Sequence, residues 1–372
     1  MKKRSSGRAR LAALLLVFFA CVFLLPASRT GESKLYLLSA AVPAAMLLLL
    51  FFPGGALFLD RPSLAAGITL CGFGILAYAI LPDEALSQGL RCVAALFFLV
   101  TGIVLVRSFR PSLPSAVLLV LCALGMLSCP LWLPSLSFSF AEGGAALLLV
   151  AVAAFLALRM CLPALLSVLS GLLLLLLQDP GTAAVWCAAS VLVFWAVSGS
   201  ALWSGITLVC AGGSFAGYLL FAPQAAQPSA PSLLPRLASM PLISPETLPE
   251  SADASDSLFF LLGEQYGLAF LFCALLLLLL LLLRGTSLAL HARKSFHAAV
   301  ALGAVLLFGL RALLFMVSLA GLLPAVSSDL PLLTASFPSL AAQFFMLGML
   351  SGVSGRNEAD LEEDSRLAML AH

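Results

Sequence analysis

Two acidic positions, eight residues apart, are the best candidates for chemistry in this chain. Asp256 ends a polar stretch rich in Pro, Ala and Ser, and Gly263-Glu264 lies inside the apolar run that follows it. An acid inside such a run is expensive to keep and therefore marks a functional candidate. Asp256, at the edge of the run, can act as a general base or cap the helix that begins at Ser257, and the two roles are compatible.

The composition places these acids in a membrane protein. Hydrophobic residues make up 62% of the 372 and charged residues 10%, and the mean hydropathy is +1.13. A bilayer core needs about 20 apolar residues per helix, and lipid-exposed backbone must bond within its own segment. We therefore expect an all-α, polytopic transmembrane helix bundle of about twelve spans. The expected spans are 11–26 (an uncleaved first helix), 35–52, 63–82, 90–107, 114–131, 143–158, 161–177, 182–197, 200–221, 258–283, 296–320 and 338–354.

The basic residues orient this bundle. With the N-terminus in the cytoplasm, fourteen of the nineteen Lys and Arg residues fall on the cytoplasmic side, as the positive-inside rule requires. Both termini are then cytoplasmic, and Asp256 faces the exterior. The net charge of +2 reports topology and predicts no nucleic-acid partner.

Three regions follow from these patterns. Residues 1–110 form a set of N-terminal transmembrane helices, 111–355 form the core, and 356–372 form an acidic cytoplasmic tail, expected as a short helix or a solvated segment. The core includes an exterior loop, 222–257, that is longer than a connection needs to be, which is typical of a functional loop. The nine cysteines show no CxxC spacing, so we expect neither a disulfide framework nor a structural metal site.

The region around Asp256 resembles the SEDS family of RodA, FtsW and SpoVE proteins. Leu248-Pro249-Glu250, Asp256 and Gly263-Glu264-Gln265-Tyr266-Gly267, followed by a Leu run ending in Arg284, are similar to its L-P-E-x-x-x-D loop and G-E-E-x-G helix. The gap from Glu250 to Asp256 is two residues longer than in that pattern. The implied fold is a ten-helix core, to which this chain adds about two N-terminal spans.

Three further segments extend the resemblance over about residues 114–355. Gln178-Asp179-Pro180-Gly181-Thr182-Ala183 is similar to the family's Q-P-D-x-G-T-A turn. Trp132 and Phe138-Ser139-Phe140-Ala141-Glu142 resemble R-W…F-x-F-Q-P-S-E. Gly321-Leu322-Leu323-Pro324 and Leu330-Pro331 resemble the G-L-L-P…P-L-P that precedes the last span.

The resemblance implies a peptidoglycan glycosyltransferase that polymerises lipid II and works with a class B penicillin-binding protein in the bacterial cytoplasmic membrane. Asp256 would be the general base of an inverting transfer. No cofactor is implied with certainty; a divalent cation (Mg²⁺ or Mn²⁺) at Asp256, or a basic side chain among Arg91, Arg236 and Arg311, would meet the leaving diphosphate. The expected groove or supporting residues are Glu264, Glu142, Gln178, Asp179, Thr182, Trp132 and Arg311.

Structural roles compete with these assignments. Glu264 could form an intramembrane ion pair with Arg311, Glu142 could cap its helix, Gln178-Asp179-Pro180-Gly181 is a good turn sequence by itself, and Trp132 suits the membrane interface.

The chain also departs from the family pattern. It lacks the Arg before Trp132 and the Lys one turn after Glu142, and the Y-G-G-S-S stretch is reduced to Ala335-Ser336-Phe337-Pro338-Ser339. Two alternatives therefore remain: a non-catalytic scaffold or regulator of the cell-wall machinery, and a transporter of the lipid-linked precursor.

Overall fold

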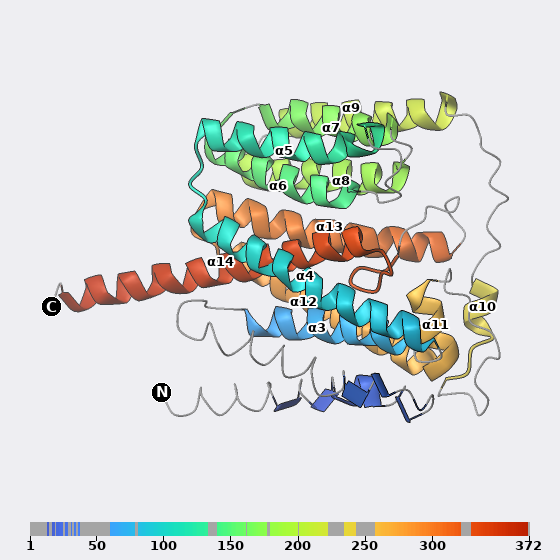
Figure 1. Ribbon diagram of the computed structural model, residues 1–372. Helices are drawn as coiled ribbons and strands as arrows, with labels where there is room; N and C mark the ends of the chain where they lie inside the picture. Colours follow the sequence, from blue (N-terminus) through green and yellow to red (C-terminus); the bar gives the residue numbers. More distant parts are fainter. Residues whose placement is uncertain are drawn as a thin grey trace.

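The computed structural model describes residues 60–78, 81–132, 140–160, 162–176, 179–199, 201–221, 234–242, 257–320 and 329–370, with scattered positions between 13 and 37. All regular structure in these residues is helical, and the helices lie side by side in one bundle (Figure 1). The described residues of the expected span 11–26, which are 13, 14, 17, 18 and 20–24, are helical, whereas the expected span 35–52 lies largely outside the described residues.

From residue 60 onward, the described residues form seven helices before the loop 222–257. They are α3 (Arg61–Leu76), α4 (Pro82–Ser108), α5 (Leu113–Trp132), α6 (Ala141–Ala157), α7 (Leu162–Leu176), α8 (Pro180–Ser198) and α9 (Ala201–Phe221). Each overlaps an expected span. The helix α4 begins eight residues earlier than expected, because Pro82 suits the first turn of a helix and Asp83 and Glu84 favour its N-terminal dipole.

In the described residues, one short helix, α10 (Leu234–Ala238), lies within that loop and four follow it. These four are α11 (Leu258–Tyr266), α12 (Leu268–Leu290), α13 (Ser295–Leu319) and α14 (Phe337–Leu370). In the described part of the chain, α4, α8, α12, α13 and α14 contain segments long and apolar enough to cross a membrane, and the shorter α3, α5, α6 and α7 are also apolar. The helix α14 continues well past its expected end at residue 354, so the acidic tail is helical through Leu370, the last residue described.

One expected span is wrong: 258–283 is two helices. Gly267 breaks it with φ 86° and ψ 173°, a conformation that is essentially restricted to glycine. The break exposes the first N–H groups of α12, and the loop satisfies them: Leu268 N donates to Pro241 O (3.0 Å) and Ala269 N to Leu242 O (3.1 Å). The segment after α10 is therefore bonded to the start of α12.

The helices α4 and α14 pack through two glycines. A Cβ on Gly102 would collide with the backbone of Phe345, and one on Gly348 with the backbone of Leu99. Small residues allow membrane helices to approach this closely. This contact fixes the start of α14 against α4.

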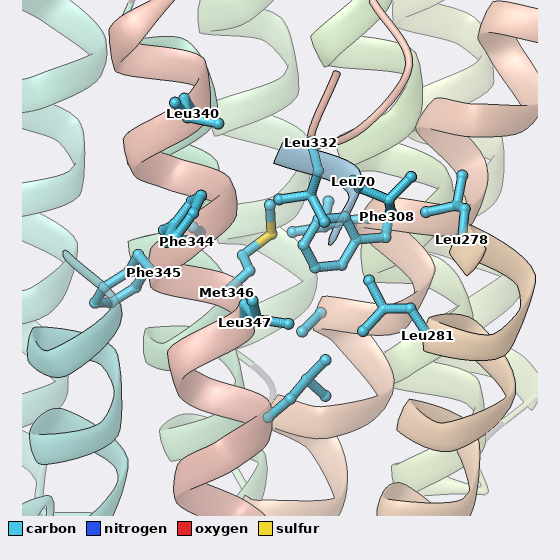
Figure 2. Packing of buried hydrophobic residues seen from close by; sticks show 14 of the residues in the cluster. Leu70, Leu278, Leu281, Phe308, Leu332, Leu340, Phe344, Phe345, Met346 and Leu347 are labelled. Atoms are coloured by element: carbon cyan, nitrogen blue, oxygen red, sulfur yellow. The ribbon is translucent and has the colours of Figure 1, made fainter. Parts of the chain in front are cut away.

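The chain between α13 and α14 enters the core as a turn. Leu330, Leu332 and Leu333 are almost fully buried. Figure 2 shows Leu332 among Leu278 and Leu281 of α12, Phe308 of α13 and Leu347 of α14. Non-helical backbone at membrane depth is tolerated where protein surrounds it and bonds it. These apolar side chains anchor the turn, and its polar groups form the site described next.

An ion pair between α3 and α12 holds the opposite end of the bundle together. Buried Asp60 caps α3, and Arg284 of α12 donates to it from Nη2 at 2.7 Å and from Nε at 3.0 Å. We call this the Asp60 end. The other end, where α13 finishes and α6, α11 and α14 begin (Figure 1), is the Asp329 end.

Candidate active site

Glu142 is the centre of a polar network at the Asp329 end. It lies in the first turn of α6. Its Oε1 accepts from Arg311 Nη1 of α13 at 2.5 Å and from Ser339 Oγ of α14 at 2.5 Å, and its Oε2 accepts from Gln343 Nε2 at 3.3 Å. Both charged side chains are less than one-fifth exposed. Three helices thus meet at one carboxylate.

Gln343 connects this network to the turn. Its Nε2 also donates to Ser339 Oγ (3.0 Å), and its Oε1 accepts from Leu332 N (2.5 Å). Leu332 has φ 66°, a left-handed conformation that costs a non-glycine residue about 1–2 kcal/mol. The amide of Gln343 satisfies the buried N–H of that strained residue and so holds the turn in place.

Asp329 begins the turn. Thr334 Oγ1 donates to its Oδ2 at 2.9 Å, and the hydroxyl of Ser257, just before α11, lies beside its carboxyl without a hydrogen bond of ordinary geometry. Burial raises the pKa of Asp329, and nearby Glu142 adds to this; Thr334, Arg311 and Ser257 lower the pKa, but the net shift is upward.

The turn is also held from α4. Gln88 Nε2 donates to Thr334 O (2.9 Å), and Arg91 Nη1 donates to Ala335 O (2.8 Å). Tyr78, at the end of α3, lies close enough to Asp329 for that charge to contribute, after burial, to a raised pKa of the phenol. Residues in or next to α3, α4, α6, α13 and α14 therefore surround the site, and α11 begins at its edge.

Asp256, the predicted base, lies outside the described residues, but the residue after it is described. Ser257 is the N-cap position of α11 and its side chain makes no capping bond. The helix α11 begins at Leu258, one residue later than expected, and the alternative role of Asp256 as its cap concerns a residue outside the described ones.

Glu264 is half-buried in α11 and has an interaction partner, but Arg311 forms its ion pair with Glu142. The expected Glu264–Arg311 pair is wrong. The reason is the direction of α11, which packs on α12 and α3: Gln265, next to Glu264, donates from Nε2 to Ala77 O at the end of α3 (2.6 Å). Gly263 lies against Met240 and Leu271, where a Cβ would not fit.

The other predicted residues lie elsewhere. Asp179 caps α8 by accepting from Thr182 N (3.0 Å), which is the structural alternative for that turn. Gln178 is outside the described residues, and Trp132 ends α5 with a side chain that is not described. Glu142 makes no cap for α6 and bonds to other helices.

Sequence reasoning missed three members of the network. Asp329 directly precedes Leu330-Pro331, and Gln88 and Gln343 lie within long helices that are otherwise apolar. Buried polar side chains in such segments are themselves a signal of a site. That signal was available for all three.

Comparisons with known proteins give a family for the C-terminal part and a fold for the bundle. A family model described as cell cycle protein (FtsW/RodA/SpoVE) matches residues 243–359, which include α11 to α13, the turn and most of α14. Among solved structures, a chain from a study of how a peptidoglycan synthase complex coordinates polymerization and crosslinking is 22% identical, with a TM-score of 0.55. The alignment covers 80% of this chain and 98% of that one. No curated protein matches significantly.

At 22% identity, the solved structure shows the fold: most of the described bundle is arranged as in a chain of a peptidoglycan synthase. The family match covers the segment that brings Ser257, Arg311 and Asp329 to the same end of the bundle. The protein is a multi-pass membrane protein whose residues 243–359 match the family model of FtsW, RodA and SpoVE, the SEDS family.

Proposed function

We propose that this protein is an inverting glycosyltransferase that polymerises lipid II into glycan strands, with Asp256 as general base. The observation that carries the proposal is the place of Ser257. This neighbour of Asp256 in the chain is the N-cap residue of α11, and Phe259 of α11 contacts Phe315 of α13 (ring centroids 5.2 Å apart), one turn after Arg311 in the network of Glu142, Arg311 and Gln343. The family match and the fold similarity support the reaction class.

The reaction joins an acceptor 4-hydroxyl to C1 of a sugar carried on a lipid diphosphate. The hydroxyl oxygen attacks C1, the bond from C1 to the diphosphate oxygen breaks, and the diphosphate leaves with the electron pair. The hydroxyl proton passes to the carboxylate of Asp256. A carboxylate at the edge of the membrane is suited to this step, as in inverting glycosidases.

The leaving diphosphate needs positive charge. Arg311 is already neutralised by Glu142, so its role is to hold α6 and α13 together. Both hydrogen bonds of Arg91 come from Nη1, which leaves this half-buried side chain as the best-placed described cation. In the described part of the chain no group of three or more His, Cys, Asp and Glu could hold a metal ion, and the cation expected at Asp256 would lie outside that part.

The family match also leads us to propose a class B penicillin-binding protein as partner and an exterior position for the Asp329 end, with both termini cytoplasmic. The similar solved chain comes from a complex that couples polymerization to crosslinking. A transpeptidase partner would act on the strand as it forms.

Reconstitution with lipid II and the cognate transpeptidase in liposomes tests the proposal. Wild-type protein should form glycan polymer, and Asp256→Ala should form none above background. Polymer from both proteins would remove Asp256 from the reaction. Absence of polymer from the wild type would contradict the enzyme and favour the scaffold, unless the precursor crosses the bilayer, which would favour the transporter.

A further inference from the structure

The N-terminal segment 13–24 packs against the start of α4. Its described residues are helical, and the exposed ones recur every three or four residues, as on the lipid-facing side of a helix: Leu14, Val17, Cys21 and Leu24. Phe23 faces the bundle and is 0% exposed. A Cβ on Gly89 of α4 would stand 3.3 Å from Cζ and 3.5 Å from Cε1 of Phe23, so the phenyl ring fills the space beside this glycine. Small residues allow membrane helices to pack this closely.

The same segment also contacts α3. The rings of Phe18 and Phe73 meet edge to face, with centroids 5.8 Å apart and an angle of 66° between their planes. This is a favourable arrangement of two aromatic rings. The two contacts involve different helices of the bundle, so the effect of losing one can be compared with the effect of losing the other.

The part of α4 around Gly89 holds the turn of the site. Gln88, directly before Gly89, donates from Nε2 to Thr334 O at 2.9 Å. Arg91, two residues after Gly89, donates from Nη1 to Ala335 O at 2.8 Å. Arg91 is also the side chain to which the proposed function gives the positive charge for the leaving diphosphate. A shift of α4 at Gly89 would therefore move both donors.

We propose that Phe23 is a positioning residue for the proposed transfer, acting through the start of α4 on Gln88, Arg91 and the turn that they hold. This inference rests on the proposed function. A displacement of about 1 Å in a site can cost about 10²-fold in rate, even when its cause lies far from the chemistry. The ring beside Gly89 fixes how deeply α4 sits in the bundle, and with it the two side chains that reach the turn.

Three alanine variants test this role in reconstituted glycan synthesis, assayed below the melting temperature of each. Phe23→Ala should lower turnover at saturating lipid II about tenfold. Leu24→Ala, at the neighbouring exposed position, is the matched control and should retain the wild-type rate. Phe18→Ala removes the same kind of ring from the contact with α3 and should lower the melting temperature but not turnover. Normal turnover in Phe23→Ala, or equal losses in Phe18→Ala and Phe23→Ala, would overturn the inference.

An exchange of large and small side chains tests the contact itself. Gly89→Leu alone places a side chain where the ring of Phe23 lies and should lower turnover. In Phe23→Ala/Gly89→Leu the leucine fills the space that the ring leaves, so turnover should recover to above that of either single variant. Losses that multiply in the double variant would show that the two positions do not act through one contact.

Amide hydrogen exchange tests the same link without any activity. Residues 329–336 should exchange faster in Phe23→Ala than in the wild type or in Leu24→Ala, because the bonds from Gln88 and Arg91 to the turn are weakened. Unchanged exchange would overturn the positioning role. A wild-type preparation that forms no glycan would contradict the proposed function, whereas active wild type with an equally active Phe23→Ala would contradict only the role of Phe23.

Discussion

The residues of the site show how a few polar side chains stabilise an irregular turn inside an apolar bundle. Glu142 accepts hydrogen bonds from Arg311, Ser339 and Gln343, and Gln343 accepts one from Leu332 N. Each bond replaces one that water would supply, and in the low-dielectric interior an unpaired group would be costly. The network is therefore expected to act as a unit.

The pair of Glu142 and Arg311 provides the first prediction. Removing either charge leaves the other uncompensated and mostly buried, so Glu142→Gln and Arg311→Gln should each lower the free energy of unfolding by about 3 kcal/mol. The double variant should recover about 1–3 kcal/mol relative to the sum of the single losses. Denaturant titration in mixed micelles measures this. Additive losses would show that the two side chains are not energetically coupled.

At the residue scale, the sequence identified some of the network and missed the rest. Glu142 and Arg311 stood out because they are charges within or beside apolar segments, but their partnership could not be read from the sequence, since it depends on α6 lying against α13. Glu264 seemed the simpler partner because the break at Gly267 was not anticipated. Asp329 was overlooked because it adjoins a motif without belonging to it.

At the scale of elements, hydropathy predicted most helices well and failed where backbone geometry decides. Apolar runs located α3 to α9 and α13, because a helix is the economical way to satisfy backbone in lipid. The same apolar pattern continues across Gly267, so only the conformation of that residue separates α11 from α12. A glycine within an apolar run is weak evidence of a break when it stands alone.

The break supplies the second prediction. Gly267→Ala forces a side chain into a conformation that costs about 1–3 kcal/mol and should lower the melting temperature in detergent. Gly213→Ala is the control: Gly213 lies within α9 and a Cβ there meets nothing within 4 Å. That variant should melt at or above the wild-type temperature. Equal melting of Gly267→Ala and the control would mean that the break is not required.

At the scale of the whole molecule, the two ends differ in what holds them. In the described residues, the Asp60 end is joined by an ion pair between buried Asp60, which caps α3, and partly exposed Arg284 of α12. The Asp329 end joins α4, α6, α13 and α14 through the turn and carries the start of α11. This polarity is what a reaction confined to one face of a membrane requires.

The third prediction concerns which face that is. In a cysteine-free background, Asp83→Cys at the Asp329 end should react with a membrane-impermeant maleimide in intact cells, because Asp83 is exposed and expected outside. Arg293→Cys, exposed in the connection between α12 and α13, should react only in inverted vesicles. The reverse labelling pattern would mean that the orientation in the membrane is inverted and that the Asp329 end faces the cytoplasm.

The most direct test of the account is the initial rate of glycan synthesis by the reconstituted complex carrying Asp256→Asn. Removal of a general base should slow synthesis by about 10²–10⁴-fold while lipid II still binds. Asp253→Asn changes the same kind of side chain three residues earlier in the loop and should retain nearly the wild-type rate. Near-normal synthesis by Asp256→Asn, with the control equally active, would contradict the assignment of this carboxylate as the base.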